Sequence, residues 1–319
     1  MQKTSLISNL KKLPGVFWGL VILFIALSVF TNSFFDLDNL LNVLNQAAIL
    51  LVVAVGVTMT ILDGGIDLST GGTMCLSGMA AAMVLRDVGS FPLALLAALA
   101  VGLVVGFINS FFIVRMRIEA FIVTFAMMSV TSGLVMGITE GNVIVGFPDI
   151  VKAFRSFSLA GISSYVIIAA VVFAIMAFFL YRTTWGTYMY AVGGSRQVAH
   201  YAGINTTRIE SSAYLLSSLF AGLGGFLLLT RMGSGMSTSG IGYEWDAIAA
   251  VVIGGTPFEG GRGGIGGTLI GVGIIVILKN GLNHLGMTSS WQTFVIGVVV
   301  ILSIMVDVFL YNRKKRQEA

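Results

Sequence analysis

The sequence predicts an all-α polytopic membrane protein, and three observations support this fold class. Hydrophobic residues make up 56% of the 319 positions, and charged residues make up only 10%. In an ordinary soluble domain about a quarter of the residues are charged. The chain also contains ten apolar runs, most of them close to the roughly 20 residues that a helix needs to cross the hydrocarbon core of a bilayer. We therefore expect ten transmembrane spans.

The ten runs cover residues 17–35, 40–62, 71–85, 91–114, 120–138, 162–181, 211–230, 243–257, 264–283 and 291–310. Basic residues precede the first run, but no small-residue cleavage site follows it, so we interpret it as a retained anchor and not as a signal peptide. The runs 71–85 and 243–257 are short and adjoin glycine clusters. This pattern indicates broken helices that begin or end inside the membrane.

The distribution of Lys and Arg predicts that both termini are cytoplasmic, because short cytoplasmic loops carry an excess of these residues. With the N-terminus inside, the inner side holds Lys3, Lys11, Lys12, Arg115, Arg117, Arg182, Arg196, Arg208, Arg262, Arg313, Lys314, Lys315 and Arg316. The outer side holds only Arg86, Lys152, Arg155 and Arg231, and Lys279 falls within a span. The net charge of +4 is explained by this topology, and a nucleic-acid partner is not needed.

No catalytic or metal-binding constellation is apparent in the sequence. The two histidines, His200 and His284, are too far apart in the predicted topology to share a metal, and the single cysteine excludes an internal disulfide. The segment 261–266 matches G-x-G-x-x-G but follows a membrane span instead of a strand, and no phosphate-binding G-x-x-x-x-G-K-[ST] loop occurs. We therefore expect neither an enzyme nor a cofactor on this chain, and any chemical energy must come from a partner.

The stretch 64–72, GGIDLSTGG, places a carboxylate among four glycines between two apolar runs. An acidic residue at the centre of a membrane helix costs about 2.5–3.5 kcal/mol on insertion scales, so it needs water, partners or backbone donors. Glycine lets the backbone leave the helix, and Asp67 or Ser69 can cap the helix that starts near residues 68–70. Two roles remain open for Asp67: a structural cap, and direct contact with a transported solute.

Further polar residues within the apolar runs are candidates for the same pathway. The predicted pathway set is Gln46, Asp67, Ser69, Asn109, Asp246 and Asn280. Asn109 and Asn280 can instead form hydrogen bonds between helices, and Glu244 and Asp246 can instead act as interfacial anchors beside Trp245. The pairs Gly102/Gly106 and Gly267/Gly271 provide small surfaces for close helix packing.

A weak internal repeat relates residues 106–125 to residues 277–297. Each segment has an asparagine near the end of one span, a short connector, and Phe-Ile-Val or Phe-Val-Ile at the start of the next span. The two segments are five spans apart, so they cross the membrane in opposite directions. Inverted repeats of this kind are common in transporters, and an ion-coupled secondary transporter is therefore an alternative function.

Five segments together resemble the permease subunits of bacterial ABC importers for ribose, xylose and related sugars. They are GGIDLSTGG, EAFIVTFAMMS at 119–129, WGTYMYAVGGSRQVAHYAGIN at 185–205, YEWDAIAAVVIGGTPFEGGRGGIGGTLIG at 243–271 and KNGLNHLGMTSSWQ at 279–292. The resemblance extends in order over residues 39–307. It implies a single transmembrane domain, 1–319, in the bacterial inner membrane, surrounded by lipid. It also implies a second permease subunit, a cytoplasmic ATPase that binds ATP and Mg²⁺, and an extracytoplasmic sugar-binding protein.

The resemblance further implies that the cytoplasmic loop 182–208 contains a coupling helix that docks into the ATPase. The residues assigned to it are Gly194, Ser195, Arg196, Gln197, Ala199, His200, Tyr201 and Gly203. Ser195 is a suitable N-cap and Gly203 a suitable stop signal, and Val198 and Tyr201 share one helix face. The family pattern commonly has Asn-Glu where this chain has Ser195 and Arg196. Arg196 therefore either meets an acidic rim of the ATPase or serves only as a positive-inside residue.

Overall fold

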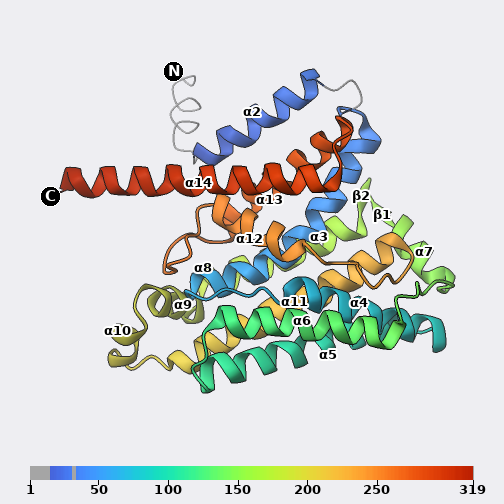
Figure 1. The fold of residues 1–319 in the computed structure, drawn as a ribbon, viewed down its shortest axis with the longest axis horizontal. Coiled ribbons are helices and arrows are strands. Elements are labelled where there is room, and N and C mark those ends of the chain that lie inside the picture. The colour runs from blue at the N-terminus through green and yellow to red at the C-terminus, as the bar shows by residue number, and fades with distance from the viewer. Residues whose placement is uncertain (1–14, 31–33, 319) are drawn as a thin grey trace.

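The computed structural model describes residues 15–30 and 34–318, which are largely helical (Figure 1). The predicted inner cations Lys3, Lys11 and Lys12 lie outside the described residues. The elements are α2 (Gly15–Phe30), α3 (Leu37–Leu62), α4 (Thr70–Asp87), α5 (Phe91–Ser110), the π-helix η1 (Phe111–Arg115), α6 (Ala120–Thr139), α7 (Asp149–Ser156), β1 (Ser158–Leu159), β2 (Ile162–Ser163), α8 (Ser164–Arg182), α9 (Thr184–Gly194), α10 (Arg196–Tyr201), α11 (Thr206–Met232), α12 (Tyr243–Ile253), α13 (Ile265–His284) and α14 (Ser289–Glu318).

Six helices of the described residues are long and apolar enough to cross a membrane: α3, α5 with η1, α6, α8, α11 and α13. The fold is thus that of a polytopic helical membrane protein, as predicted. The 11-residue helix α12 extends about 16 Å, roughly half of the hydrocarbon core. The run 243–257 therefore does form a short helix that is followed by a glycine-rich segment. The run 71–85, which was also expected to be short, instead forms the 18-residue helix α4.

Burial separates the inner helices from the outer ones. In the most apolar window of α11, 78% of the residues are buried, and the value is 61% for α3 and for α13. The corresponding values are only 28% for α5 and α8 and 22% for α6. Figure 1 shows α2 and α14 along one edge of the molecule and α5 and α6 along the opposite edge. The apolar outer faces of these helices suit contact with lipid chains.

The helix contacts form two similar sets. Helix α11 packs against α3, α4 and α5, and helix α3 packs against α11, α12 and α13. Contacts between α4 and α5 and between α4 and α6 have counterparts between α12 and α13 and between α12 and α14. Helices α3 to α6 and helices α11 to α14, which are five predicted spans apart, therefore occupy equivalent places in the packing. Helices α2 and α8 do not, because α2 packs against α13 and α8 packs against α3.

Short elements lie at the two ends of the bundle. Helices α9 and α10 lie at one end, and α7 with the β1–β2 hairpin lies at the other (Figure 1). The hairpin is antiparallel, with Ser158 paired to Ser163 and Leu159 to Ile162. An isolated bridge between Ile144 and Gly235 ties the segment after α6 to the segment after α11.

The predicted small-residue contacts are confirmed, because both glycine pairs lie against a neighbouring backbone. A Cβ atom on Gly102 would lie 2.5 Å from the carbonyl oxygen of Ser218 on α11. A Cβ atom on Gly271 would lie 1.9 Å from the carbonyl oxygen of Ala250 on α12. Glycine is thus required there by close approach of two helices, and backbone flexibility is not the reason.

We expect Gly271→Ala to reduce the amount of stable protein, because its methyl group would push α12 and α13 apart. Overpacking of this kind typically costs about 1–3 kcal/mol. The measurement is the apparent melting temperature of the detergent-solubilised protein, followed by size-exclusion chromatography. Gly137→Ala on α6 is the matched control, because nothing lies within 4 Å of the added methyl group. Equal melting temperatures for the two variants would contradict the packing assignment.

Candidate functional site

Asp67 lies in the break between α3 and α4 and is completely buried. Its Oδ1 accepts hydrogen bonds from the backbone N–H of Ser69 at 2.9 Å and from the Ser69 hydroxyl at 2.6 Å. Its Oδ2 accepts a hydrogen bond from the hydroxyl of Ser217 on α11 at 2.8 Å. Asp67 thus holds the turn before α4 through the N–H of Ser69, which is itself the N-cap residue, and the Ser69 side chain makes no cap hydrogen bond. The prediction that Asp67 or Ser69 caps the N–H groups of α4 is therefore wrong.

Asn109 of α5 completes this cluster, because its Nδ2 donates to the Ser69 hydroxyl at 2.8 Å. Asp67, Ser69, Asn109 and Ser217 have no exposed surface, and we call these four residues the Asp67 cluster. The structure therefore brings together three of the six predicted pathway residues, and it adds Ser217. The interhelical hydrogen bond expected of Asn109 is confirmed.

The other three predicted pathway residues lie elsewhere, along α3, α12 and α13. Asn280 exchanges two side-chain hydrogen bonds with Asn39 of α3, at 3.0 and 2.9 Å. Asp246 forms an ion pair with Lys279 of α13. Gln46 is half-buried on α3, two turns from Asn39 and on the same face. Asn280 thus also makes its expected interhelical hydrogen bonds.

The interfacial role considered for Glu244 and Asp246 is wrong, because their exposed fractions are only 2% and 8%. The Glu244 carboxylate accepts from the backbone N–H of Gly242 at 2.9 Å. It also lies so close to Gly71 that a Cβ atom there would be 1.7 Å from Oε2. Trp245, which is 54% exposed, is the outward-facing residue of the three, since successive helix positions point in different directions.

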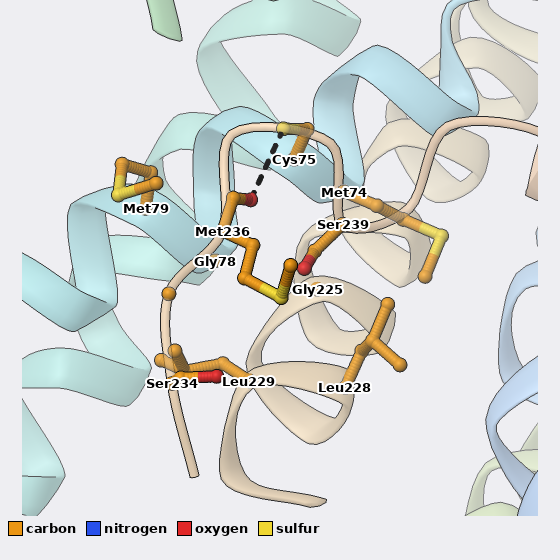
Figure 2. Close-up of a pocket in the computed structure, with 11 residues that line it drawn as sticks. Met74, Cys75, Gly78, Met79, Gly225, Leu228, Leu229, Ser234, Met236 and Ser239 are labelled. Atoms are coloured by element: carbon orange, nitrogen blue, oxygen red, sulfur yellow. Dashed lines mark hydrogen bonds between the residues drawn. The ribbon is translucent and has the colours of Figure 1, made fainter. Parts of the chain in front are cut away.

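The connector between α11 and α12, residues 233–242, covers part of α4 and α11 near the α7 end of the bundle. Figure 2 shows the residues that line a small cavity beneath it. Cys75 of α4 donates to the carbonyl oxygen of Ser237 at 3.1 Å, and Met236 of the connector also lines the cavity. The volume is about 10 Å³, which is close to the minimum for one water molecule. This cavity cannot admit a sugar, and Cys75 is a buried packing residue, as expected.

The predicted coupling loop forms two helices, α9 and α10, joined at Ser195. The Ser195 hydroxyl accepts from the backbone N–H of Val198 at 3.4 Å, and Gly203 has a φ of +83°. The predicted N-cap and the predicted glycine stop are thus both confirmed. Val198 and Tyr201 are 66% and 78% exposed, so an apolar pair faces outward from the short helix.

The end of α9 lies against the end of α3. The backbone N–H of Gly261 donates to the carbonyl oxygen of Leu62 at 2.9 Å. A Cβ atom on Gly193 would lie 1.8 Å from the same carbonyl oxygen, and one on Gly261 would lie 2.7 Å from the Gly194 backbone. Three backbone segments therefore meet directly, and the loop that carries α10 contacts the helix that leads into the Asp67 cluster.

Arg196 is paired within the chain. Its Nε donates to Oε1 of Glu210 on α11, and Arg117 of the α5–α6 connector donates to Oε2 of the same carboxylate at 3.0 Å. The Glu210 side chain is 10% exposed. Neither sequence-based role for Arg196 included this contact, which fixes the first residue of α10 to α11. A polar cavity of about 280 Å³ lies beside the three charged groups and is also lined by Asp63 and Tyr214.

The sequence does not predict the pairing of Glu210 with Arg117 and Arg196. A signal for Glu210 was present, because it is the only acidic residue between Arg182 and Arg231. A lone carboxylate that follows several arginines is a candidate for internal pairing. Ala199 was selected, but it is only 3% exposed. A charged replacement of Ala199 would therefore test the packing of the loop and not the docking of a partner.

Comparison with known proteins identifies the family. Residues 39–304 match the family described as branched-chain amino acid transport system / permease component. The chain belongs to this permease family. The permease is 39% identical to the ribose import permease protein RbsC of Escherichia coli (strain K12) over 293 residues, which are 91% of each chain. It is 41% identical to RbsC of Bacillus subtilis (strain 168) over 297 residues, which are 92% of each chain.

The galactose/methyl galactoside import permease protein MglC of E. coli (strain K12) is 32% identical to the permease over 338 aligned positions, covering 99% of each chain. No solved structure matches the permease. Together with the apolar helices, these relatives identify the permease as a multi-pass protein of the cytoplasmic membrane.

Proposed function

We propose that the permease is the transmembrane subunit of an ATP-driven ABC importer that carries a monosaccharide, such as a pentose or hexose, into the cell. The observation that carries this proposal is the nearly full-length similarity to permeases named for import of ribose and galactose. Energy comes from a separate ATPase subunit, which holds the ATP and Mg²⁺, so that this chain needs no cofactor. A sugar-binding protein delivers the sugar outside, and a second permease subunit, identical or related, completes the pathway.

We propose ten membrane crossings with both termini in the cytoplasm, and an inverted repeat of five crossings. The paired packing supports the repeat, because α3, α4, α5 and α6 have the same relationships as α11, α12, α13 and α14. Residues 1–319 form one transmembrane domain. Residues 182–208 form its cytoplasmic coupling loop, and α7 with the hairpin lies on the outer side.

In this proposal the Asp67 cluster is the inner closure of the sugar pathway. Gly193, at the end of α9, lies against the carbonyl oxygen of Leu62 at the end of α3, and Arg196 is tied to α11 through Glu210. Movement of the ATPase would therefore reach α11, which carries Ser217, and α3, which leads into the break that carries Asp67. Separation of α4 from α11 would break the hydrogen bond between Ser217 and Asp67 and expose polar groups to the sugar. Gln46, Asp246 and Asn280 contribute polar groups further along the pathway.

We expect Tyr201→Asp to abolish coupling while the protein still folds. Tyr201 is 78% exposed, so the carboxylate meets water in the isolated permease but enters an apolar contact when the ATPase docks. Tyr201→Phe is the control, because it keeps the aromatic surface. The measurement is copurification of the ATPase subunit together with binding-protein-stimulated ATP hydrolysis in proteoliposomes.

Normal copurification and hydrolysis with a stably inserted Tyr201→Asp variant would overturn the assignment of α10 as the coupling helix. Sugar uptake by the wild-type permease in vesicles that lack any ATPase would overturn the importer proposal itself. In that case the alternative, an ion-coupled secondary transporter, would replace it.

A further inference from the structure

An open apolar groove lies on the flank of the permease between α8, α9 and α11. Its volume is about 580 Å³, and its apolar lining consists of Ile175, Met176, Phe179, Leu215, Leu216 and Phe220. The mechanism proposed above uses neither this groove nor these residues. The volume is in the range of ordinary ligand sites.

The chemistry of the groove excludes a sugar and favours a hydrocarbon chain. Trp185 donates its indole N–H to the Ser212 hydroxyl at 2.8 Å, and this hydroxyl donates to the Ile209 carbonyl oxygen at 2.7 Å. The Thr183 hydroxyl donates to the Phe179 carbonyl oxygen at 2.5 Å. These polar groups of the lining already have partners, and the remaining surface is mainly aliphatic and aromatic.

Two cations flank the lining at one end of the groove, although neither belongs to the lining itself. Arg182 directly precedes Thr183, which lines the groove, and Arg208 is one helical turn before Ser212 on the same face of α11. Both arginines are exposed. Within the part of the chain that the structure describes, neither guanidinium takes part in a salt bridge. They are thus available to bind an anion from outside the chain.

The length of the groove matches one leaflet of a bilayer. Arg208 and Phe220 are twelve residues apart on α11, which corresponds to about 18 Å at 1.5 Å per residue. Half of the hydrocarbon core is about 15 Å. A chain that starts at the two arginines and ends at Phe220 would therefore extend from the headgroup region to the middle of the bilayer.

We propose that this groove binds one anionic phospholipid of the cytoplasmic leaflet, with its phosphate at Arg182 and Arg208 and an acyl chain against α8 and α11. Basic pockets between helices on the cytoplasmic side are suited to anionic headgroups. The proposal depends on the orientation given under the proposed function. A second permease copy suits the groove less well, since a symmetric contact uses the same patch twice and would bring four guanidinium groups together.

The bound lipid would stabilise the base of the coupling loop. Helix α9 begins at Thr184, at the cationic end of the groove, and it leads through Ser195 into α10. A lipid held between α8, α9 and α11 would limit the movement of α9 relative to α11. Anionic lipid would thus increase the fraction of ATP hydrolysis that is coupled to transport.

The test measures quenching of tryptophan fluorescence by brominated lipid in phosphatidylcholine vesicles that contain the full-length permease. We expect brominated phosphatidylglycerol to quench the Trp185 signal, taken as the difference between wild type and Trp185→Phe, with saturation at a few mole per cent. Brominated phosphatidylcholine should need at least a tenfold higher fraction. Arg208→Gln should raise the half-saturating fraction of phosphatidylglycerol about fivefold to tenfold. The matched control is Arg115→Gln, which removes an exposed cation from the same end of the molecule and should change nothing.

Equal quenching by the two lipids would mean ordinary boundary lipid only and would overturn the proposal. A second result would also overturn the proposal: neither lipid quenches Trp185, and Arg208→Gln changes the mass of the permease assembly. The groove would then be an interface with another protein chain. Leu216→Trp, which fills the groove, provides a second test: it should reduce the amount of phosphatidylglycerol that stays bound to the permease in native mass spectrometry. None of these measurements needs the ATPase or a sugar, so their failure is distinguishable from failure of the importer proposal.

Discussion

Glu210→Ala is expected to reduce sugar uptake about tenfold and to lower the amount transported per ATP hydrolysed. The substitution leaves Arg196 and Arg117 without their shared carboxylate and releases α10 from α11. Breaking a buried ion pair costs about 3–5 kcal/mol. The arginine side chains are 46% and 48% exposed, so solvent screening reduces the effect to about 1–2 kcal/mol. A free-energy difference of about 1.4 kcal/mol corresponds to a tenfold change in an equilibrium constant.

The measurement is the ratio of imported sugar to released phosphate in proteoliposomes that contain the complete importer. Glu210→Gln should give an intermediate ratio, because its amide oxygen still accepts a hydrogen bond from one guanidinium. Asp149→Ala is the control. It removes the exposed ion pair with Lys152, whose side chain is 73% exposed, and such pairs contribute little. An unchanged ratio in Glu210→Ala would show that Arg196 does not transmit movement through α11.

Asp67→Ala is expected to give the second large effect, a loss of most uptake together with a lower melting temperature. Three buried donors lose their acceptor: the Ser69 N–H, the Ser69 hydroxyl and the Ser217 hydroxyl. Each unsatisfied buried group costs about 1–3 kcal/mol. The two hydroxyls can rotate toward other acceptors, whereas the backbone N–H cannot. We therefore expect the free energy of unfolding to fall by about 2 kcal/mol.

Asp67→Asn should retain most of the uptake, because it preserves the geometry of the cluster. Its Oδ1 can accept from Ser69, and its Nδ2 can donate to the Ser217 hydroxyl, which also serves as an acceptor. Asp67→Ser keeps a side-chain oxygen that can accept from the Ser69 N–H but is too short to reach Ser217, so its uptake should lie between those of the alanine and asparagine variants. All variants are compared at matched membrane expression. If asparagine were as damaging as alanine, the negative charge itself would be required.

Much of the architecture could be predicted from the sequence, because the bilayer imposes a strong constraint on composition. A run of apolar residues near 20 in length has to become a helix, since only internal hydrogen bonds satisfy its backbone in lipid. Local signals were also sufficient where the chemistry is local. Ser195 caps α10 and Gly203 ends it, and the spacing of Gly102 and Gly106 predicts a close helix contact that the structure contains.

Contacts between distant segments could not be predicted in the same way. Arg196 and Glu210 are only fourteen residues apart, yet Arg117 joins them from a connector 93 positions from Glu210. The choice of partner depends on how α10, α11 and the α5–α6 connector pack together, and residue type alone does not specify it. The packing of α4 against α12 is likewise not visible in the sequence. The pattern beside Trp245 therefore favoured an interfacial role for Glu244, although this residue is buried against Gly71.

The sequence by itself determined that this protein is helical and lies in a membrane, that the chain leaves the helix between α3 and α4, and which family it belongs to. These properties follow from hydrophobic length, glycine positions and motifs that are continuous along the chain. Only the tertiary structure decided which polar groups satisfy one another. Asp67 is held by Ser217 across 150 positions, and Asp246 is paired with Lys279. A buried polar group must find a partner wherever the packing places one, and that partner is set by the arrangement of helices in space.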